Sequence, residues 1–92
     1  MDRQLPTVLA PEALCEEDRA ALARLPSLLA DRGRVDVAIE RHRTRNGSVA
    51  IVATIGVARA VGRHTVAASA SASAETAGEA LCEAARQLGV AL

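Results

Sequence analysis

Two runs of alternating apolar residues lie on either side of the dipeptide Asn46-Gly47, and together they limit the fold more than any other feature. Valine and isoleucine occupy every second position over residues 35–39, and apolar side chains recur at every second position over residues 49–57. Alternation of this kind is typical of strands with one apolar face. Asn-Gly between two such runs is the strongest short-range signal for a hairpin. We therefore predict two antiparallel strands joined at this dipeptide.

The hydrophobic pattern also selects the length of the turn. A two-residue loop would place the apolar residues of the two strands on opposite faces, because a slip of one residue moves every side chain of a strand to the other face. A three-residue loop over 45–47 brings them to one face, and Gly47 supplies the positive φ that its last position requires. The predicted pairs are Thr44 with Ser48, Ile39 with Ala53, Val37 with Ile55 and Val35 with Val57.

The segment that follows continues the period of two. Apolar residues occupy the even positions over 66–72, and threonine, alanine and serine occupy the odd positions over 65–71. We predict a third strand, after a four-residue loop over 60–63 that keeps β-branched Val61 out of a tight two-residue turn. The predicted pairs are Val57 with Val66, Ile55 with Ala68 and Ala53 with Ala70. The alternative is continuous helix, because alanine is the best helix former and a poor strand former.

Helical patterns flank the three strands. Over residues 11–32 leucines recur at spacings of three and four, and Gly33 is a fitting stop. Pro26 lies inside this region, so we expect one kinked helix or two short ones. After the strands, Ser73 is the predicted N-cap of a last helix that ends at Gly89. The apolar face of the last helix comprises Ala77, Leu81, Ala84 and Leu88.

These elements define a single α+β domain over residues 11–92, preceded by a loosely ordered lead-in over residues 1–10. The predicted order is helix, three-stranded antiparallel meander, helix. We expect both helices to cover the same sheet face, because the large apolar residues of the strands share one face. A chain of 92 residues has no room for a second core.

Composition excludes several classes of partner. The chain has no Phe, Trp or Tyr, which excludes the base stacking used by single-strand binders and by the sheets that bind RNA. Eleven basic and eleven acidic residues balance to a net charge of zero, so no overall field draws the protein to nucleic acid or to anionic lipid. No apolar run approaches membrane-spanning length, and we expect no membrane partner.

Cysteine usage predicts a reducing, cytoplasmic environment. Cys15 and Cys82 lie far apart without a CxxC pattern, so they do not indicate a disulfide framework. We expect Cys15 to pack or cap near the start of the first helix, and Cys82 to act as a small hydrophobe beside the core. Neither cysteine, nor His42 or His64, has metal-ligand spacing, so we predict no metal and no cofactor. Abundant alanine and the absence of lysine indicate a GC-rich bacterial, archaeal or phage genome.

The predicted order of elements resembles the double-stranded RNA-binding domain over roughly residues 20–90. The resemblance covers a helix ending in "LPSLLADRG", two hairpins and a closing Ala-rich helix. It implies RNA contacts from the first helix, from the loop between the first two strands and from a lysine cluster at the start of the last helix. The hairpin here is basic, through Arg43 and Arg45, whereas the last helix starts with Glu75 and Glu79 in place of lysines.

The residues around the first hairpin are candidates for binding or catalysis. Arg41, Arg43 and Arg45 form a candidate nucleic-acid surface, and the alternative is a charged edge that guards against aggregation. Glu40 and His42 lie two apart on one strand and have the residue types of an acid-base pair. No nucleophile, oxyanion donor or pocket motif accompanies them in the sequence, so we predict no catalytic site and no enzyme.

The sheet face away from the helices is the candidate partner surface. No charged side chain occurs over residues 49–58 of the middle strand, a composition suited to close approach by a second sheet or a protein partner. We expect a non-enzymatic protein-interaction module that acts as a homodimer, adaptor or inhibitor, with duplex RNA or DNA binding through residues 41–45 as the alternative. The predicted contact residues are Ala38, Val52, Thr54, Ala67 and Ser69, with Ala38, Thr54 and Ser69 aligned across the strands.

Overall fold

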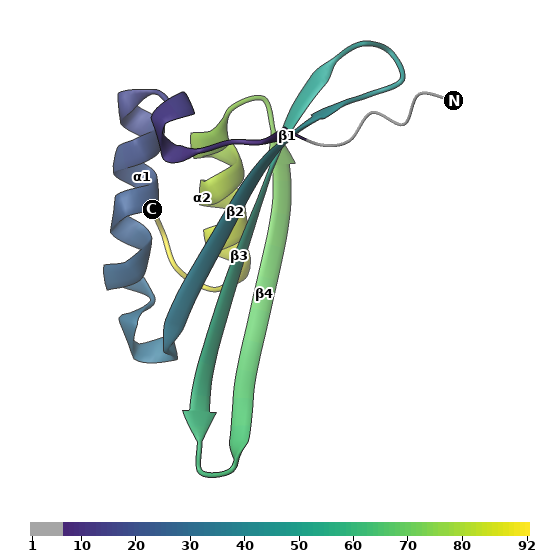
Figure 1. The fold of residues 1–92 in the computed structure, drawn as a ribbon. Helices are drawn as coiled ribbons and strands as arrows, with labels where there is room; N and C mark the ends of the chain where they lie inside the picture. The colour runs from purple at the N-terminus through teal and green to yellow at the C-terminus, as the bar shows by residue number, and fades with distance from the viewer. Residues whose placement is uncertain (1–6) are drawn as a thin grey trace.

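The computed structural model describes residues 7–92, which form two layers, an antiparallel sheet and a pair of helices (Figure 1). The sheet contains a meander of β2 (Arg34–Arg43), β3 (Val49–Val61) and β4 (His64–Ala74). The helices are α1 (Glu16–Leu28) and α2 (Ala77–Gln87), and both lie on one side of the sheet. The predicted α+β class, the order of elements and the shared helix-covered face are confirmed.

A short additional strand, β1 (Thr7–Val8), lies along the outer edge of β2. Val8 pairs with Glu40, and the Leu9 backbone N–H donates to the Ile39 carbonyl at 2.9 Å. Within the predicted lead-in over residues 1–10, residues 7–9 are therefore hydrogen-bonded to the sheet. Residues 1–6 lie outside the described part of the chain.

The first hairpin has the predicted register. Val35 pairs with Val57, Val37 with Ile55 and Ile39 with Ala53. The turn is closed by the Thr44 N–H, which donates to the Ser48 carbonyl at 2.8 Å, and Gly47 adopts a φ of 80°. The three-residue loop is confirmed, and with it the gathering of the large apolar residues on one face.

The second hairpin differs from the prediction by two residues. Val61 pairs directly with His64, so the loop consists of Gly62 and Arg63 alone instead of four residues. Gly62 takes the position of positive φ, at 63°, so β-branched Val61 stays in the strand and the objection to a two-residue turn disappears. The corrected pairs are Val57 with Ala68, Ile55 with Ala70 and Ala53 with Ala72. Each side chain keeps its predicted face, because the shift is even.

The first helical region is one α-helix flanked by two single 3-10 turns, Pro11–Ala13 and Ala30–Arg32. Helix α1 continues through Pro26 and ends two residues later. Leu25 and Leu29 are fully buried, whereas Leu28, which belongs to the predicted apolar stripe, is 39% exposed. Cys15 occupies the N-cap position but makes no side-chain capping bond, and its side chain is exposed.

The last helix begins three residues later than predicted. Thr76 is the N-cap, and its hydroxyl accepts a hydrogen bond from the Glu79 N–H at 3.2 Å. Ser73, the predicted cap, lies instead within β4 and pairs with Val52 of β3. The predicted apolar face and the stop at Gly89, with a φ of 84°, are confirmed. The buried residues of this helix are Ala77, Ala80, Leu81, Ala84 and Ala85, and Leu88 is buried directly after it.

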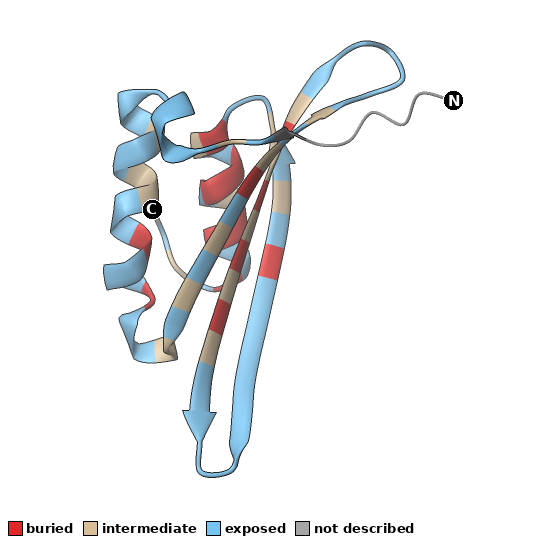
Figure 2. Cartoon of the chain, viewed as in Figure 1, coloured by how far each residue is buried: buried red, intermediate tan, exposed pale blue. Residues whose placement is uncertain are grey.

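The core lies between the sheet and the two helices and contains no aromatic residue (Figure 2). Its largest fully buried side chains are Leu25, Leu29, Ile55 and Leu81. Alanines fill much of the remaining contact between α2 and the sheet, which lets the helix backbone approach the strands closely. The β3–β4 hairpin extends past the helices, and residues 59–69 are all exposed there.

Candidate functional site

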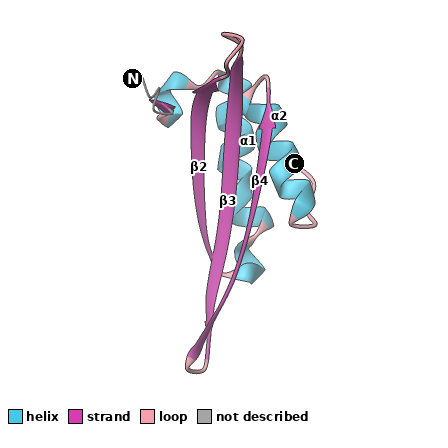
Figure 3. Cartoon of the chain, turned by 90° about the vertical axis from the view of Figure 1, so that its right-hand side faces the viewer, coloured by secondary structure: helices cyan, strands magenta, loops and turns pink. Residues whose placement is uncertain are grey.

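The candidate site is the face of the sheet opposite the helices, which we call the open face. Figure 3 looks toward this face, with β2, β3 and β4 in front of the helices. No helix or loop of residues 7–92 covers it, because α1 and α2 both pack on the other side. Its central residues are Ala38 from β2, Val52, Thr54, Gly56 and Ala58 from β3, and Ala67, Ser69 and Ser71 from β4.

The register of the strands sets which residues of the open face are neighbours. Ala38, Thr54 and Ser71 form one row, and the Thr54 and Ser71 hydroxyls are hydrogen-bonded at 2.8 Å. The predicted alignment of Ser69 with Thr54 is wrong, because the second hairpin is shifted by two residues. Ser69 lies opposite Gly56, and Ala67 lies opposite Ala58. All five predicted contact residues nevertheless lie on the open face.

Gly56 creates a shallow hollow on the open face. The hollow has a volume of about 390 Å³, and it forms because glycine has no side chain and its neighbours are alanine and serine. A Cβ built on Gly56 would meet only the Asp36 carbonyl oxygen, at 3.9 Å, so the space above the glycine is free. The lining residues are Asp36, Gly56, Val57, Ala58, Ala67, Ala68 and Ser69.

The charges on the open face are confined to β2, where they are paired. Arg34 lies 3.5 Å from Asp36, and His42 lies 3.4 Å from Glu40. Strands β3 and β4 carry no charged residue on this face. The predicted proximity of Glu40 and His42 is therefore observed, as a half-exposed contact between the two side chains at the margin of a neutral surface.

The basic hairpin lies at one end of the sheet. Arg41 and Arg43 project from the side of β2 opposite His42, because alternate residues of a strand point to opposite faces. Arg45 lies in the turn, and all three arginines are exposed. Among residues 7–92, none of them lies within ion-pair distance of a carboxylate.

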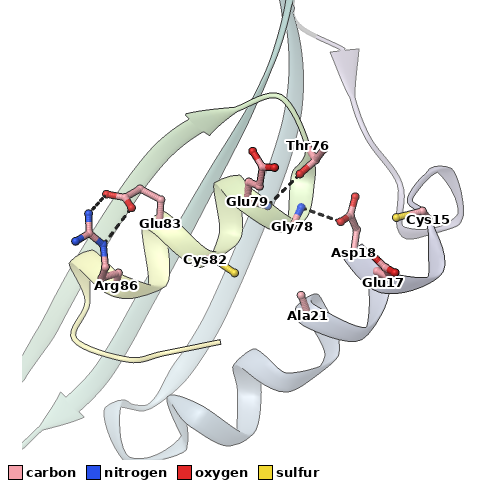
Figure 4. A pocket seen from close by; sticks show the side chains of 10 residues that line it. All are labelled: Cys15, Glu17, Asp18, Ala21, Thr76, Gly78, Glu79, Cys82, Glu83 and Arg86. Atoms are coloured by element: carbon pink, nitrogen blue, oxygen red, sulfur yellow. Dashed lines mark hydrogen bonds and ion pairs between the residues drawn. The ribbon is translucent and has the colours of Figure 1, made fainter.

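A second concave site lies between α1 and α2 (Figure 4). This interhelical groove has a volume of about 620 Å³, and its wall carries both cysteines and four carboxylates. Cys82 is exposed in it, so the expectation that this residue lies beside the core is wrong. Glu83 accepts a 2.6 Å hydrogen bond from Arg86, which lowers the pKa of the Glu83 carboxyl and raises the pKa of Arg86.

Asp18 connects the two helices across this groove. Its carboxylate accepts a hydrogen bond from the Gly78 N–H at 3.0 Å, one of the N–H groups at the start of α2 that has no partner within the helix. Together with Thr76, Asp18 therefore completes the N-terminal cap of α2. Sequence reasoning missed this contact, because nothing local in the sequence indicates that residues sixty apart meet.

Replacing Asp18 with alanine is expected to destabilise the fold by about 1.5 kcal/mol, because a charge-assisted hydrogen bond at a helix N-terminus is lost. The measurement is chemical denaturation followed by circular dichroism. Glu17→Ala is the matched control, since Glu17 lines the same groove and its side chain makes no hydrogen bond to any of residues 7–92. Equal losses for the two variants would contradict the capping role of Asp18.

Residues 7–92 contain no cluster of three or more His, Cys, Asp or Glu side chains arranged to hold a metal ion. The described helices are all too short or too polar to span a bilayer. Comparisons with protein-family models, with curated proteins and with solved structures found no match to this chain.

Proposed function

We propose that this protein is a non-enzymatic protein-interaction module that binds its partner through the open face. The observation that carries the proposal is the neutral, small-residue surface of β3 and β4, which is left uncovered while charges are confined to β2. A sheet face in contact with water normally carries long charged side chains. The small, neutral side chains of this face instead allow another protein to approach closely.

The chemistry of the open face fits a second sheet or a flat protein surface. Val52 supplies an apolar contact, the hollow above Gly56 accommodates a protruding side chain, and Thr54 with Ser69 and Ser71 supplies hydroxyls that both donate and accept hydrogen bonds. The partner is a second copy of the chain or a different protein whose contact surface is also weakly charged. In both versions Ala38, Val52, Thr54, Ala67 and Ser69 lie at the interface.

Replacing Val52 with arginine is expected to abolish the contact without unfolding the protein, because a charged side chain would have to be buried unpaired in the interface. Light scattering after size exclusion should show a species heavier than the 9.5 kDa chain for the native protein, and a lighter species than the native one for the variant. Val49→Arg is the control, since Val49 is an exposed valine on the same strand but on its other side.

Different results would contradict the two versions of the proposal, the homodimer and the complex with a different protein. A native protein that stays monomeric at high micromolar concentration would remove the homodimer. A partner captured by the native chain and retained by Val52→Arg would remove the open face as the contact surface.

The exposed arginines of the first hairpin favour one second candidate, weak binding of duplex RNA or DNA. Arg41, Arg43 and Arg45 have no carboxylate partner among the described residues and are available to phosphates. Glu75 and Glu79 near the start of α2 oppose such binding by like-charge repulsion. Affinity that falls steeply with salt, and that is lost when Arg43 and Arg45 are replaced by glutamate, would establish this candidate over the protein-interaction module.

A further inference from the structure

The two edges of the sheet are unequally protected. On one side, β1 covers part of β2, and β2 itself carries charged residues along its length. On the other side, β4 is the last strand of the sheet, and no strand among residues 7–92 pairs with its outer edge. Proteins normally guard such an edge with charge, proline or a bulge. From residue 64 to residue 74, β4 contains no proline and no Asp, Glu, Lys or Arg, and its register with β3 is unbroken.

The backbone groups that face outward from β4 follow from the hairpin. Val61 and His64 close a two-residue turn, so they form a hydrogen-bonded pair, and every second residue of β4 after His64 also bonds to β3. The odd-numbered residues of β4, which alternate with the residues bonded to β3, therefore direct their N–H and C=O groups away from β3. Consistent with this, the Ser71 carbonyl accepts a hydrogen bond from the Gln87 side chain at 3.2 Å. The outward-facing residues are Thr65, Ala67, Ser69, Ser71 and Ser73.

The charges that bracket this strand are opposite in sign and symmetric about its centre. Arg63 lies six residues before Ser69, and Glu75 lies six residues after it. An antiparallel pairing of two β4 strands about a two-fold axis at Ser69 would bring Arg63 of each copy, in the turn before β4, to the same end of the contact as Glu75 of the other copy, directly after β4. The same register aligns outward-facing residues with outward-facing residues, Thr65 with Ser73, Ala67 with Ser71 and Ser69 with itself.

We propose that the outer edge of β4 pairs with the β4 edge of a second copy of this chain in this register. Five residue pairs would face each other and exchange backbone hydrogen bonds, with the Ser71 carbonyl accepting from the second copy in place of the Gln87 side chain, and the two sheets would become one. Because paired residues have the same parity, both open faces lie on one side of the joined sheet and the helices lie on the other. The edge dimer does not rest on the function proposed for the open face, since it uses backbone groups in the plane of the sheet.

The size of the contact sets the concentration range for the test. Eleven residues at about 3.4 Å each give an edge about 37 Å long. Such a contact, confined to the thickness of one sheet, is smaller than the interface of a permanent complex, so the dimer is expected to dissociate on dilution. Association is therefore measured across a dilution series by sedimentation or light scattering.

Thr65→Pro is the sharpest variant, because proline removes an outward-facing N–H at both ends of the symmetric contact and leaves the hydrogen bonds between β4 and β3 in place. Thr65 is also not among the contact residues proposed for the open face. We expect loss of the dimer with an unchanged circular dichroism spectrum. Thr65→Ala retains the N–H and is the matched control, which should dimerise like the native protein. A Thr65→Pro protein that is folded and still dimeric would overturn the proposal, as would a native protein that is monomeric throughout the dilution series.

Charge reversal tests the register and does not depend on proline being tolerated. Arg63→Glu and Glu75→Arg should each weaken the dimer roughly 5- to 10-fold, because each places like charges opposite one another at both ends of the contact. The double variant should restore native affinity. Failure of the double variant to recover affinity would overturn the register centred on Ser69. A dimer lost in Val52→Arg but retained in Thr65→Pro would assign self-association to the open face and exclude the edge contact.

Discussion

Replacing Gly33 with alanine should destabilise the fold by about 3 kcal/mol or more. Gly33 connects the 3-10 turn after α1 to the start of β2, with a φ of 103° and a ψ of −143°, a region that side-chain-bearing residues rarely occupy. A Cβ at this position would also lie 2.2 Å from the Ala58 carbonyl oxygen of β3. Because that oxygen belongs to the backbone of β3, the clash can be relieved only if the first residues of β2 move away from β3.

Gly47→Ala is the matched control for this prediction. Gly47 also has a positive φ, of 80°, but no atom lies within 4 Å of the position of its Cβ. We expect a loss of about 1 kcal/mol from the backbone conformation alone, rising to about 1 to 2 kcal/mol for Gly47→Val, whose branched side chain tolerates that region less well. Denaturant titration followed by circular dichroism gives each value. Equal losses for Gly33→Ala and Gly47→Ala would show that the close approach to Ala58 has no energetic consequence.

Leu81→Ala is expected to cost about 3 to 4 kcal/mol, because a fully buried leucine is replaced and a cavity remains. The neighbours of Leu81 in α2 are Ala80, Ala84 and Ala85, which are also buried and are too short to fill the space. The site therefore has little capacity to collapse around the missing atoms. A loss of this size is a large part of the stability of a domain of 92 residues.

Leu28→Ala provides the comparison for Leu81→Ala. Leu28 is the last residue of α1 and is 39% exposed, so its truncation removes less buried area and opens no enclosed cavity. We expect a loss below about 1 kcal/mol. Thermal or denaturant unfolding of the two variants should separate them clearly. Similar losses would mean that α2 does not pack on the sheet as described.

The two hairpins show what the hydrophobic pattern of a sequence determines. In the first hairpin, a one-residue error would divide Val35, Val37 and Ile39 from Ile51 and Ile55, so the three-residue loop was consistent with a shared core and the two-residue loop was not. In the second hairpin, a shift of two residues keeps every side chain on its face. Alanine and serine repeat along β4 with almost no difference in size, so the pattern does not distinguish registers two residues apart. The pattern therefore determined the faces of the strand and not its alignment.

The start of α2 was missed for a related reason. Ser73 and Thr76 are both good N-cap residues, and local propensity does not choose between them. The choice depends on β4 pairing with β3 as far as Ala74, which keeps Ser73 extended and leaves Thr76 as the first residue free to cap. The exposure of Cys82 and the Asp18 contact likewise depend on how α1 and α2 meet. A strand of two residues, such as β1, is too short to show any period.

The open face shows a similar division between what was and was not predicted. The period of two was enough to place Ala38, Val52, Thr54, Ala67 and Ser69 on the uncovered side of the sheet. The rows that these residues form, and the hollow above Gly56, depend on the register of β4 and emerged only from the structure. The interhelical groove depends on contacts between distant segments and had no local signal at all.

The β3–β4 hairpin extends past the helices. The part of this hairpin beside the helices and the part beyond them therefore differ in local stability. Near α2, residues such as Ala53 and Ile55 are fully buried, so their amide protons should exchange with deuterated solvent only when the whole domain unfolds. Over residues 59–69 every side chain is exposed, so the same ladder can open locally without disturbing the core. Exchange rates should therefore rise steeply along β4 toward its turn. The protein thus combines a stable region beside α2 with a locally unstable hairpin end over residues 59–69. Any binding partner that contacts this hairpin end should slow hydrogen exchange at the amides of residues 59–69.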